Sequence, residues 1–504
     1  MDKVLVFVPS TKQLPSWQKK VVSVLEEFYD IHFCLVVRGE TEGKLRSFLK
    51  LNRSVSRIFY KSQIYIESKL FKLEEDLVAV NSQNIFRCYP KGSRFVDVVN
   101  RTNCDFSEED YEFGLNFGLR IVRGDLLQMF KRGLLGFHHG DPNNYRGSAP
   151  GFFEIRNKES FAGLIIQQLS DELDGGKILA NTFVPCHYSL GLTQNWLFGK
   201  SAMLMREYLS QEPIQIADRY IKSYYQLYRF PSFQKVIGYT ANFYLNAFKS
   251  VAKQIQERFI PESDWSIAFV KNGSFKPVLM SNSEYYYADP FLLPDGSIAC
   301  ERFSRRKKIG DIIHYKAGRI SELLLEIKGH KSYPYYFSSE GSNYIIPETG
   351  SLRRLYLLKE IDKKFVTIDS LSTPYEVYDF SFFSLGIENF GFYSVGNRGA
   401  EALYCVQIIS IYPFIIDFAN AILITTDERY TRCGGTIWLD EYNVYRPVQQ
   451  QRNGNYGDSI GIAIHPINDL KSFNFTLLEN IKRNFNLKNL HTISVPNGLI
   501  DYKK

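Results

Sequence analysis

The chain of 504 residues exceeds the length at which a single hydrophobic core usually stops growing, so we expect two domains and a connecting segment. Hydrophobic residues make up 44% of the sequence and charged residues 23%, a composition that excludes a largely disordered protein. The formal net charge of +7 is spread without a basic stripe, which argues against a nucleic-acid partner. Seven cysteines without C-x-x-C spacing indicate a reduced, cytoplasmic setting.

The first elements predict a parallel α/β sheet. Residues 4–8 and 31–37 are short apolar runs typical of buried parallel strands, and residues 17–29 between them have helical spacing. The segment from Pro9 to Lys12 follows the first run, where a dinucleotide-binding domain would have a Gly-rich turn, so a nicotinamide cofactor is not expected. The same run meets proline and polar residues too early for a signal peptide.

A dense polar segment follows a later strand. We expect a helix over residues 125–133 and then a strand from Leu134 that ends in a polar turn, where open α/β sheets place their sites. Adjacent histidines on a strand point to opposite faces, so the pair in this turn cannot hold one metal ion, and no metal is expected. One ring should face a cleft and the other should pack, unless both cap the strand end by bonding to loop carbonyls. The polar residues are His138, His139, Asp141, Asn143, Asn144 and Arg146.

Three motifs follow His138 at intervals that make a recognisable pattern. They are Arg146-Gly147-Ser148-Ala149-Pro150, Ala162-Gly163 and Leu173-Asp174-Gly175-Gly176. Together with His138 they resemble the catalytic domain of methionyl-tRNA and sugar N-formyltransferases. The resemblance implies a Rossmann-like formyltransferase domain over residues 1–190 and 10-formyltetrahydrofolate as the formyl donor. It also implies that His138 polarises the formyl carbonyl, that Asp174 orients this imidazole, and that substrate is bound by Asn143, Asn144, Arg146 and Gly147.

One position departs from the family pattern. Formyltransferases of this type have a catalytic Asn two residues before the His, and this chain has Gly136 there. Loss of one donor to the developing oxyanion typically lowers the rate by ~10²–10³. We therefore expect a slow enzyme, a donor supplied instead by Asn143, Asn144 or His139, or a domain that only binds its ligand.

Residues 191–262 have helical and aromatic character and are interpreted as a helical connector. After Asp264 the sequence changes to short β-branched and aromatic runs broken by Gly, Asn, Ser and Asp, which predicts an all-β domain over residues 263–504. At ~45–50 residues per four-stranded blade, this length predicts a five-bladed β-propeller. The apolar stretch from Cys405 to Thr425 contains Pro413 and Asp417, so buried strands are favoured over a membrane span.

Four short motifs occur within the β-rich half: Ala-Asp-Pro-Phe at 288–291, Ser-Tyr-Pro at 332–334, Pro-Glu-Thr at 347–349 and Arg-Pro-x-Gln at 446–449. They resemble the N-terminal domain of glucosamine inositolphosphorylceramide transferases and, more distantly, five-bladed glycoside hydrolases. The resemblance implies carboxylates that converge on a central channel. Alternatively, each acid caps a turn or a strand edge. Asp289, Glu348 and Asp379 are the implied catalytic residues, and Glu301, His330, Arg446 and Gln449 the implied sugar-binding residues.

The leading hypothesis is an enzyme of surface-glycan biosynthesis. It transfers a formyl group from 10-formyltetrahydrofolate to the amine of an amino sugar, while the propeller binds or processes glycan. The alternative is a degenerate formyltransferase module with catalysis in the propeller, as a glycosyltransferase or glycosidase. The sequence leaves the oligomeric state open.

Overall fold

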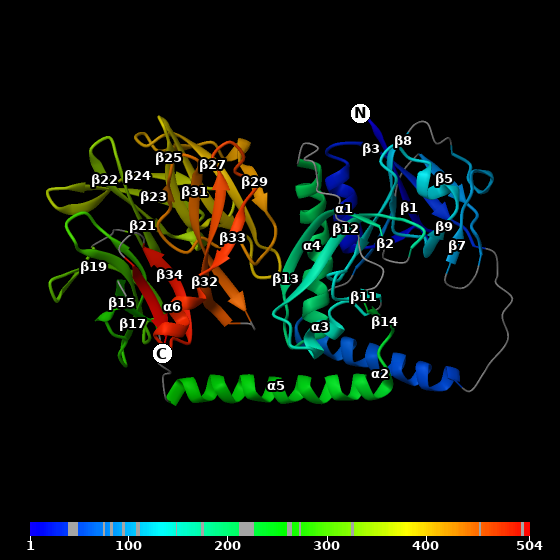
Figure 1. Cartoon of the computed structure of the whole chain (residues 1–504), viewed down its shortest axis with the longest axis horizontal. Coiled ribbons are helices and arrows are strands. Elements are labelled where there is room, and N and C mark those ends of the chain that lie inside the picture. Colours follow the sequence, from blue (N-terminus) through cyan, green and yellow to red (C-terminus); the bar gives the residue numbers. More distant parts are fainter. Residues whose placement is uncertain are drawn as a thin grey trace. The chain divides into compact units, whose positions relative to one another are not determined.

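The chain forms two compact units, Met1–Lys249 and Ser250–Lys504, which are described separately (Figure 1). The computed structural model describes residues 1–38, 49–73, 76–80, 84–92, 96–106, 111–147, 149–172, 176–210, 226–259, 265–271, 274–323, 327–452, 455–494 and 498–503.

A seven-stranded sheet organises the N-terminal unit, in the order β13-β12-β10-β8-β1-β3-β5. The five strands from β10 to β5 run parallel, whereas β12 and β13 are antiparallel to their neighbours. Val4 to Val8 of β1 are fully buried, as expected for a strand covered on both faces. The predicted parallel α/β sheet is therefore confirmed. Its strands are β1 (Lys3–Pro9), β3 (Asp30–Val36), β5 (Ile85–Cys88), β8 (Tyr111–Asn116), β10 (Leu134–His138), β12 (Phe161–Gln168) and β13 (Lys177–Pro185).

Helices cover the sheet. Helices α1 (Ser16–Leu25) and α4 (Leu190–Ser210) pack on one face, where Val21 and Leu197 join the core of the sheet strands. The other face is covered by aromatic residues such as Phe106 and Phe130. The helix expected over residues 125–133 is a single 3₁₀ turn, η3 (Asp125–Gln128), because Gly133 at φ 75° turns the chain directly into β10. The remaining helices of this unit are α2 (Leu49–Leu70), α3 (Phe152–Arg156) and α5 (Phe233–Phe259), which continues past the division between the units.

Short strand pairs complete the N-terminal unit. They are β2 (Gln13–Pro15) with β4 (Leu77–Ala79), β6 (Lys91–Gly92) with β7 (Val96–Val98) and β9 (Ile121–Arg123), and β11 (Arg146–Gly147) with β14 (Leu227–Tyr228).

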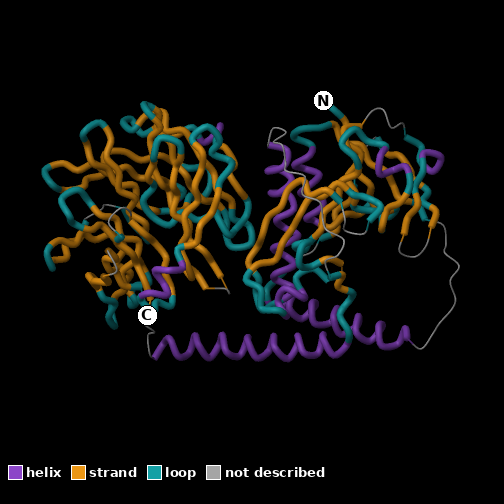
Figure 2. The backbone as a smooth tube through the Cα atoms, viewed as in Figure 1, coloured by secondary structure: helices purple, strands orange, loops and turns teal. Residues whose placement is uncertain are grey.

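The C-terminal unit is built almost entirely of strands (Figure 2). They form five antiparallel sheets, which confirms a β-rich second half. The sheets are β15 (Ser266–Lys271), β16 (Ser274–Leu279), β34 (Asn489–Ser494) and β35 (Leu499–Lys503); β17 (Tyr285–Leu292), β18 (Ile298–Ser304), β19 (Ile309–Lys316) and β20 (Arg319–Glu322); β21 (Ser332–Ser339), β22 (Ser342–Glu348), β23 (Arg354–Ile361) and β24 (Lys364–Ser372); β25 (Tyr378–Leu385), β26 (Glu388–Val395), β27 (Ala402–Ser410), β28 (Ile415–Ile416) and β29 (Ile422–Thr425); and β30 (Trp438–Leu439), β31 (Asn443–Arg452), β32 (Asn455–Pro466) and β33 (Asn474–Leu477). A short helix, α6 (Glu479–Asn484), precedes β34.

The apolar stretch from Cys405 to Thr425 lies in this β structure. It contributes most of β27 and all of β28 and β29 to a single sheet. Among the helices that the structure describes, none combines the length and the apolar character that crossing a membrane requires.

The first strands of three consecutive sheets share one local deformation. The pairing register shifts after Ala288 in β17, after Ser332 in β21 and after Tyr378 in β25. The next residue in each strand has a positive φ: 51° at Asp289, 42° at Tyr333 and 49° at Asp379. Strand β21 contacts both β17 and β25, so the three bulges lie on neighbouring strands.

Candidate functional sites

His138 is the last residue of β10, at the carboxyl end of the parallel part of the sheet. Its ring is buried, and its Nε2 lies 3.1 Å from the backbone carbonyl oxygen of Tyr145. Because a carbonyl only accepts hydrogen bonds, Nε2 carries the proton of this contact. The chain after β10 thus folds back so that its backbone fixes the imidazole.

His139 points to the opposite side of β10. Its ring contacts Phe198 at a centroid distance of 4.6 Å and Trp17 at 5.2 Å, and its Nε2 lies 3.1 Å from the hydroxyl of Ser201. Burial, aided by the neighbouring His138, lowers the pKa of His139 to about 3. His139 is therefore a neutral packing residue, and it also lines the small cavity beside Glu154.

The loop between His138 and Arg146 holds its polar side chains in a turn. The side-chain amides of Asn143 and Asn144 both donate to the carboxylate of Asp141, at 3.2 and 2.7 Å, and both residues are exposed. Both amides are thus engaged within the turn itself. Arg146 is buried, and Gly147, at φ 104°, passes the carbonyl of Tyr228 so closely that a Cβ would lie 2.1 Å from its oxygen.

An apolar side chain occupies the position where the formyltransferase pattern has an Asn. A Cβ built on Gly136 would lie 3.1 Å from Cδ2 of Leu169. Gly136 and His138 share one face of β10, since they are two residues apart on a strand. Leu169 therefore fills the place next to His138 from which an Asn would donate.

Asp174, the implied partner of His138, and Ser148 lie outside the described residues. The structure places another carboxylate, that of Glu154, near His138. Glu154 of α3 is only 2% exposed, and burial, together with repulsion from Asp141 and Glu159, raises its pKa from 4.5 to about 7. The only signal in the sequence is one acidic residue within the apolar run Gly-Phe-Phe-Glu-Ile.

Glu154 and His138 border the same point of the loop. A Cβ added to Gly140 would lie 3.1 Å from Nε2 of His138 and 3.7 Å from Oε1 of Glu154. A cavity of about 10 Å³ adjoins Glu154, with His139 and Arg146 also in its lining, and it has room for about one water molecule. A buried imidazole and a buried carboxyl that titrates near neutrality are the parts of an acid–base site.

In the C-terminal unit, the implied carboxylates come together and bind the bulged strands. Oε2 of Glu348 accepts the backbone N–H of Asp379 at 2.8 Å, and Oδ2 of Asp289 accepts that of Tyr333 at 3.3 Å. The backbone N–H of Asp289 is in turn bound by Asp501 at 3.0 Å. Each carboxylate thus links one sheet to the next, which is a structural role.

The same acids share their electrostatic environment. Burial is the main cause that raises the pKa of Asp289 to about 6, with His491 opposing and Asp501 and Asp379 adding to the rise. Burial likewise raises the pKa of Asp379 to about 6, against the attraction of Arg432. Burial and the charges of Asp289 and Glu348 raise the pKa of Glu301 well above its usual range.

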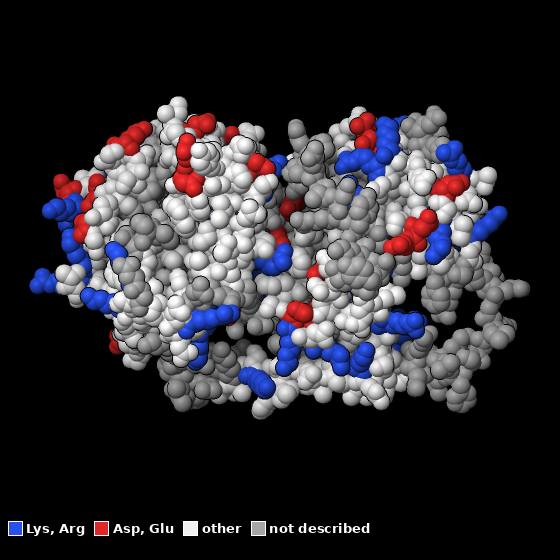
Figure 3. All heavy atoms as spheres, viewed as in Figure 1, with Lys and Arg blue, Asp and Glu red and all other residues white. Residues whose placement is uncertain are grey.

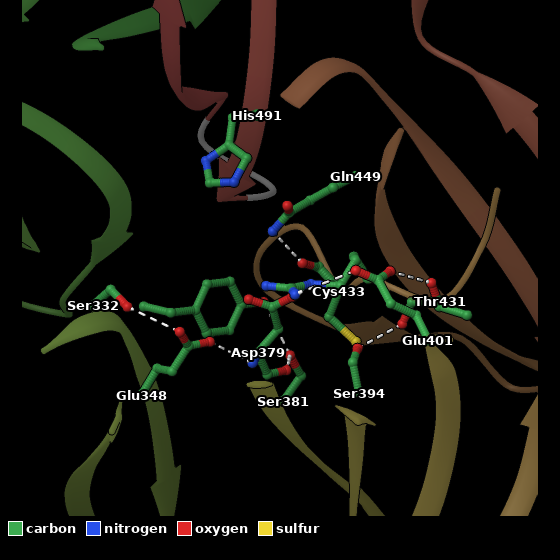
Figure 4. Close-up of polar contacts among 12 residues, drawn as sticks. Ser332, Glu348, Asp379, Ser381, Ser394, Glu401, Thr431, Cys433, Gln449 and His491 are labelled. Carbon is green, nitrogen blue, oxygen red and sulfur yellow. Dashed lines mark hydrogen bonds and ion pairs between the residues drawn. The ribbon is translucent and has the colours of Figure 1, made fainter. Parts of the chain in front are cut away.

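Two charged residues that the sequence did not single out, Arg432 and His491, balance these acids. Figure 4 shows Glu348, Asp379 and Glu401 among the polar contacts of this cluster, with His491 nearby. Nε of Arg432 lies 2.6 Å from Oδ2 of Asp379, and its Nη1 lies 3.8 Å from Glu401. Nδ1 of His491 lies 3.0 Å from Asp501 and 3.3 Å from Asp289. Burial lowers the pKa of His491, but the two carboxylates outweigh this effect and raise it.

The other implied sugar-binding residues lie in different surroundings. His330 lies at the edge of the cluster, with Nε2 3.7 Å from Glu301. Gln449 donates to the carbonyl of Cys433 at 2.6 Å. Arg446 is fully buried with its Nε 3.3 Å from His465, so it belongs to the core.

Asp289, His491 and Asp501 have the only ligand atoms among the described residues that could surround a metal ion, all within 4.8 Å of one another. The carboxylates favour the protonated form of His491, and an imidazolium supplies the positive charge that a metal would bring. A cation could bind here only if His491 lost its proton.

Comparison with known proteins gives structural matches only. No protein-family model matches the sequence, and neither does any curated protein. A sugar N-formyltransferase from Shewanella sp FDAARGOS_354 has 15% identity, covers 60% of this chain and 98% of its own, and has a TM-score of 0.28. Glycinamide ribonucleotide transformylase 1 from Symbiobacterium toebii has 13% identity, covers 42% of this chain and 86% of its own, and has a TM-score of 0.27.

The α-L-arabinofuranosidase PaAbf62A from Podospora anserina has 10% identity, covers 47% of this chain and 85% of its own, and has a TM-score of 0.33. These TM-scores are too low for the likeness to assign a fold or an activity. The function is therefore argued from the residues.

Proposed function

We propose that the N-terminal unit transfers a formyl group from 10-formyltetrahydrofolate to the amine of an amino sugar. The observation that carries the proposal is the buried pair of His138 and Glu154 at the carboxyl end of the parallel sheet, with the pKa of Glu154 raised to about 7. The motif around His138 supports formyl transfer as the reaction, because it resembles the formyltransferase pattern.

In the proposed reaction the amine nitrogen attacks the formyl carbon. A C–N bond to the sugar forms, the C–N10 bond of the donor breaks, and the proton lost by the amine ends on N10 of tetrahydrofolate. The Nε2 proton of His138, which now binds the Tyr145 carbonyl, stabilises the negative charge that develops on the formyl oxygen. Glu154, which is partly ionised near pH 7, accepts the proton of the amine. Asp174 orients the imidazole, as the family resemblance implies.

The test follows the release of tetrahydrofolate from formyl-tetrahydrofolate with a panel of nucleotide-linked amino sugars. Removal of a positioned acid–base group typically lowers a rate by ~10²–10⁴, so we expect losses of this size in His138→Gln and Glu154→Gln. Glu26→Gln is the control, since Glu26 is an exposed carboxylate of the same unit whose ion pair with Lys19 lies outside the site. Wild-type rates in either catalytic variant would contradict the proposal.

A second function is proposed for the C-terminal unit. We infer that its five sheets are the blades of a propeller and that Asp289, Glu348 and Asp379 process or bind glycan. The raised pKa values of Asp289 and Asp379 favour this reading, because glycoside chemistry uses one protonated and one ionised carboxyl. The test is hydrolysis or transfer of aryl glycosides by wild type and Asp289→Asn. Turnover that persists in a folded Asp289→Asn variant would contradict it.

A further inference from the structure

A second, larger cavity lies on the N-terminal unit, outside the site of His138. It has a volume of about 630 Å³ and forms a groove between α3 and residues 234–249 of α5, with Tyr188 at one side. Its α5 wall is fixed to the rest of the unit. Tyr239 and Phe243 of α5 are buried against Phe152 and Phe153, and the hydroxyl of Tyr239 donates to the buried carboxylate of Glu67 at 2.7 Å.

The groove is lined by positive charge without a compensating acid. Arg156 and Lys158 come from the end of α3 and the following turn, and Lys235 and Lys249 come from α5. The lining contains no Asp or Glu, and in the described part of the chain none of the four cations forms an ion pair with a carboxylate. Lys and Arg side chains gather along α5 and beside α3 in Figure 3.

Neutral hydrogen-bond donors stand between the cations. Gln234, Asn242 and Asn246 line the groove with side-chain amides, each of which offers two N–H donors. A ligand with several anionic oxygens would meet charge and directional donors on both walls. Two phosphate groups in succession match this lining better than a single carboxylate, because they spread two or more charges over the length of the groove.

The groove is connected to the proposed catalytic residues through α3. Phe153 and Glu154 line the small cavity, whereas the next two residues, Ile155 and Arg156, line the groove. The ammonium of Lys235 lies 5.3 Å from the centre of the Phe153 ring, so it stands at the junction of the two.

We propose that this groove binds the diphosphate of a glycosyl diphosphate, whose sugar then reaches toward Glu154. The statement about the sugar rests on the proposed function, but binding of a diphosphate does not. Two sources share this chemistry, a nucleoside diphosphate sugar and a prenyl diphosphate sugar.

The experiment measures affinity by calorimetry for inorganic pyrophosphate, uridine and thymidine diphosphates, and farnesyl diphosphate. The double variant Lys235→Ala/Lys249→Ala is compared with Lys20→Ala/Lys364→Ala, which removes two exposed lysines elsewhere. We expect affinity to fall roughly tenfold or more for each groove lysine removed, with the control at wild-type affinity. Preference for a nucleoside or for farnesyl diphosphate identifies the source.

Absence of diphosphate binding, or equal affinity in wild type and groove variant, overturns the proposal. The proposal is also overturned if the groove variant loses affinity for a tetrahydrofolate polyglutamate but keeps its affinity for diphosphates. The groove would then hold the carboxylates of the donor. No formyl donor is needed in the diphosphate titrations, so failure of formyl transfer in His138→Gln and failure of diphosphate binding are separate results.

Discussion

Replacement of Glu154 by Gln should raise stability at alkaline pH while it lowers activity. Burial raises the pKa of Glu154 from 4.5 to about 7, so the folded state holds the proton more tightly than the unfolded state does. The stability contributed by this proton is complete below pH 4.5 and is lost as the pH rises through about 7. The difference corresponds to about 3 kcal/mol, and it needs little discount for solvent because the residue is 2% exposed.

The amide of the Glu154→Gln variant is neutral at every pH and resembles the protonated carboxyl of the wild type. Urea unfolding of the full chain, followed by tryptophan fluorescence, should therefore show equal stability of the two proteins near pH 4. At about pH 8 the variant should be more stable by up to about 3 kcal/mol. Trp17 and Trp196 report on the N-terminal unit. If wild type and Glu154→Gln differ in stability by the same amount at both pH values, the pKa of Glu154 is not raised by burial. The role of Glu154 as the proton acceptor would then be refuted as well.

Two further outcomes are expected. Asp379→Ala leaves the largely buried guanidinium of Arg432 without its closest partner and should lower the free energy of unfolding by about 3–5 kcal/mol in a urea titration, whereas a purely catalytic role predicts no change. Gly136→Asn collides with Leu169 and should destabilise the chain. Gly136→Asn combined with Leu169→Ala has room for the amide and should raise the rate of formyl transfer by ~10². An unchanged rate of tetrahydrofolate release in the double variant would show that the missing hydrogen-bond donor does not limit the reaction.

Local patterns predicted the framework of the N-terminal unit. The apolar runs at 4–8 and 31–37 are β1 and β3, and the polar turn after Leu134 follows β10. The two strand predictions are correct because a strand that is buried on both faces needs a continuous apolar run, which is visible in the sequence. The prediction of a helix over residues 125–133 is wrong, because the helix propensity of these residues does not overcome the turn at Gly133.

The contacts that define the sites were not visible in the sequence. Leu169 meets Gly136 only because β10 and β12 pair antiparallel, and Arg432 reaches Asp379 across 53 residues. Glu154 has an unusual pKa because of where α3 packs, and no local pattern reports that burial. Motif resemblance could indicate which acids of the β-rich half gather, but the backbone N–H groups that they bind follow from the bulges.

The sheet that joins β15 and β16 to β34 and β35 sets an order for folding during synthesis. Ser266 to Phe269 pair with Leu499 to Tyr502, so this sheet stays incomplete until the last strand has left the ribosome. The N-terminal unit, whose described strands all precede Lys249, has no such requirement and can fold while translation continues. A ribosome stalled just after α6 should therefore carry a protease-resistant first unit followed by a protease-sensitive segment.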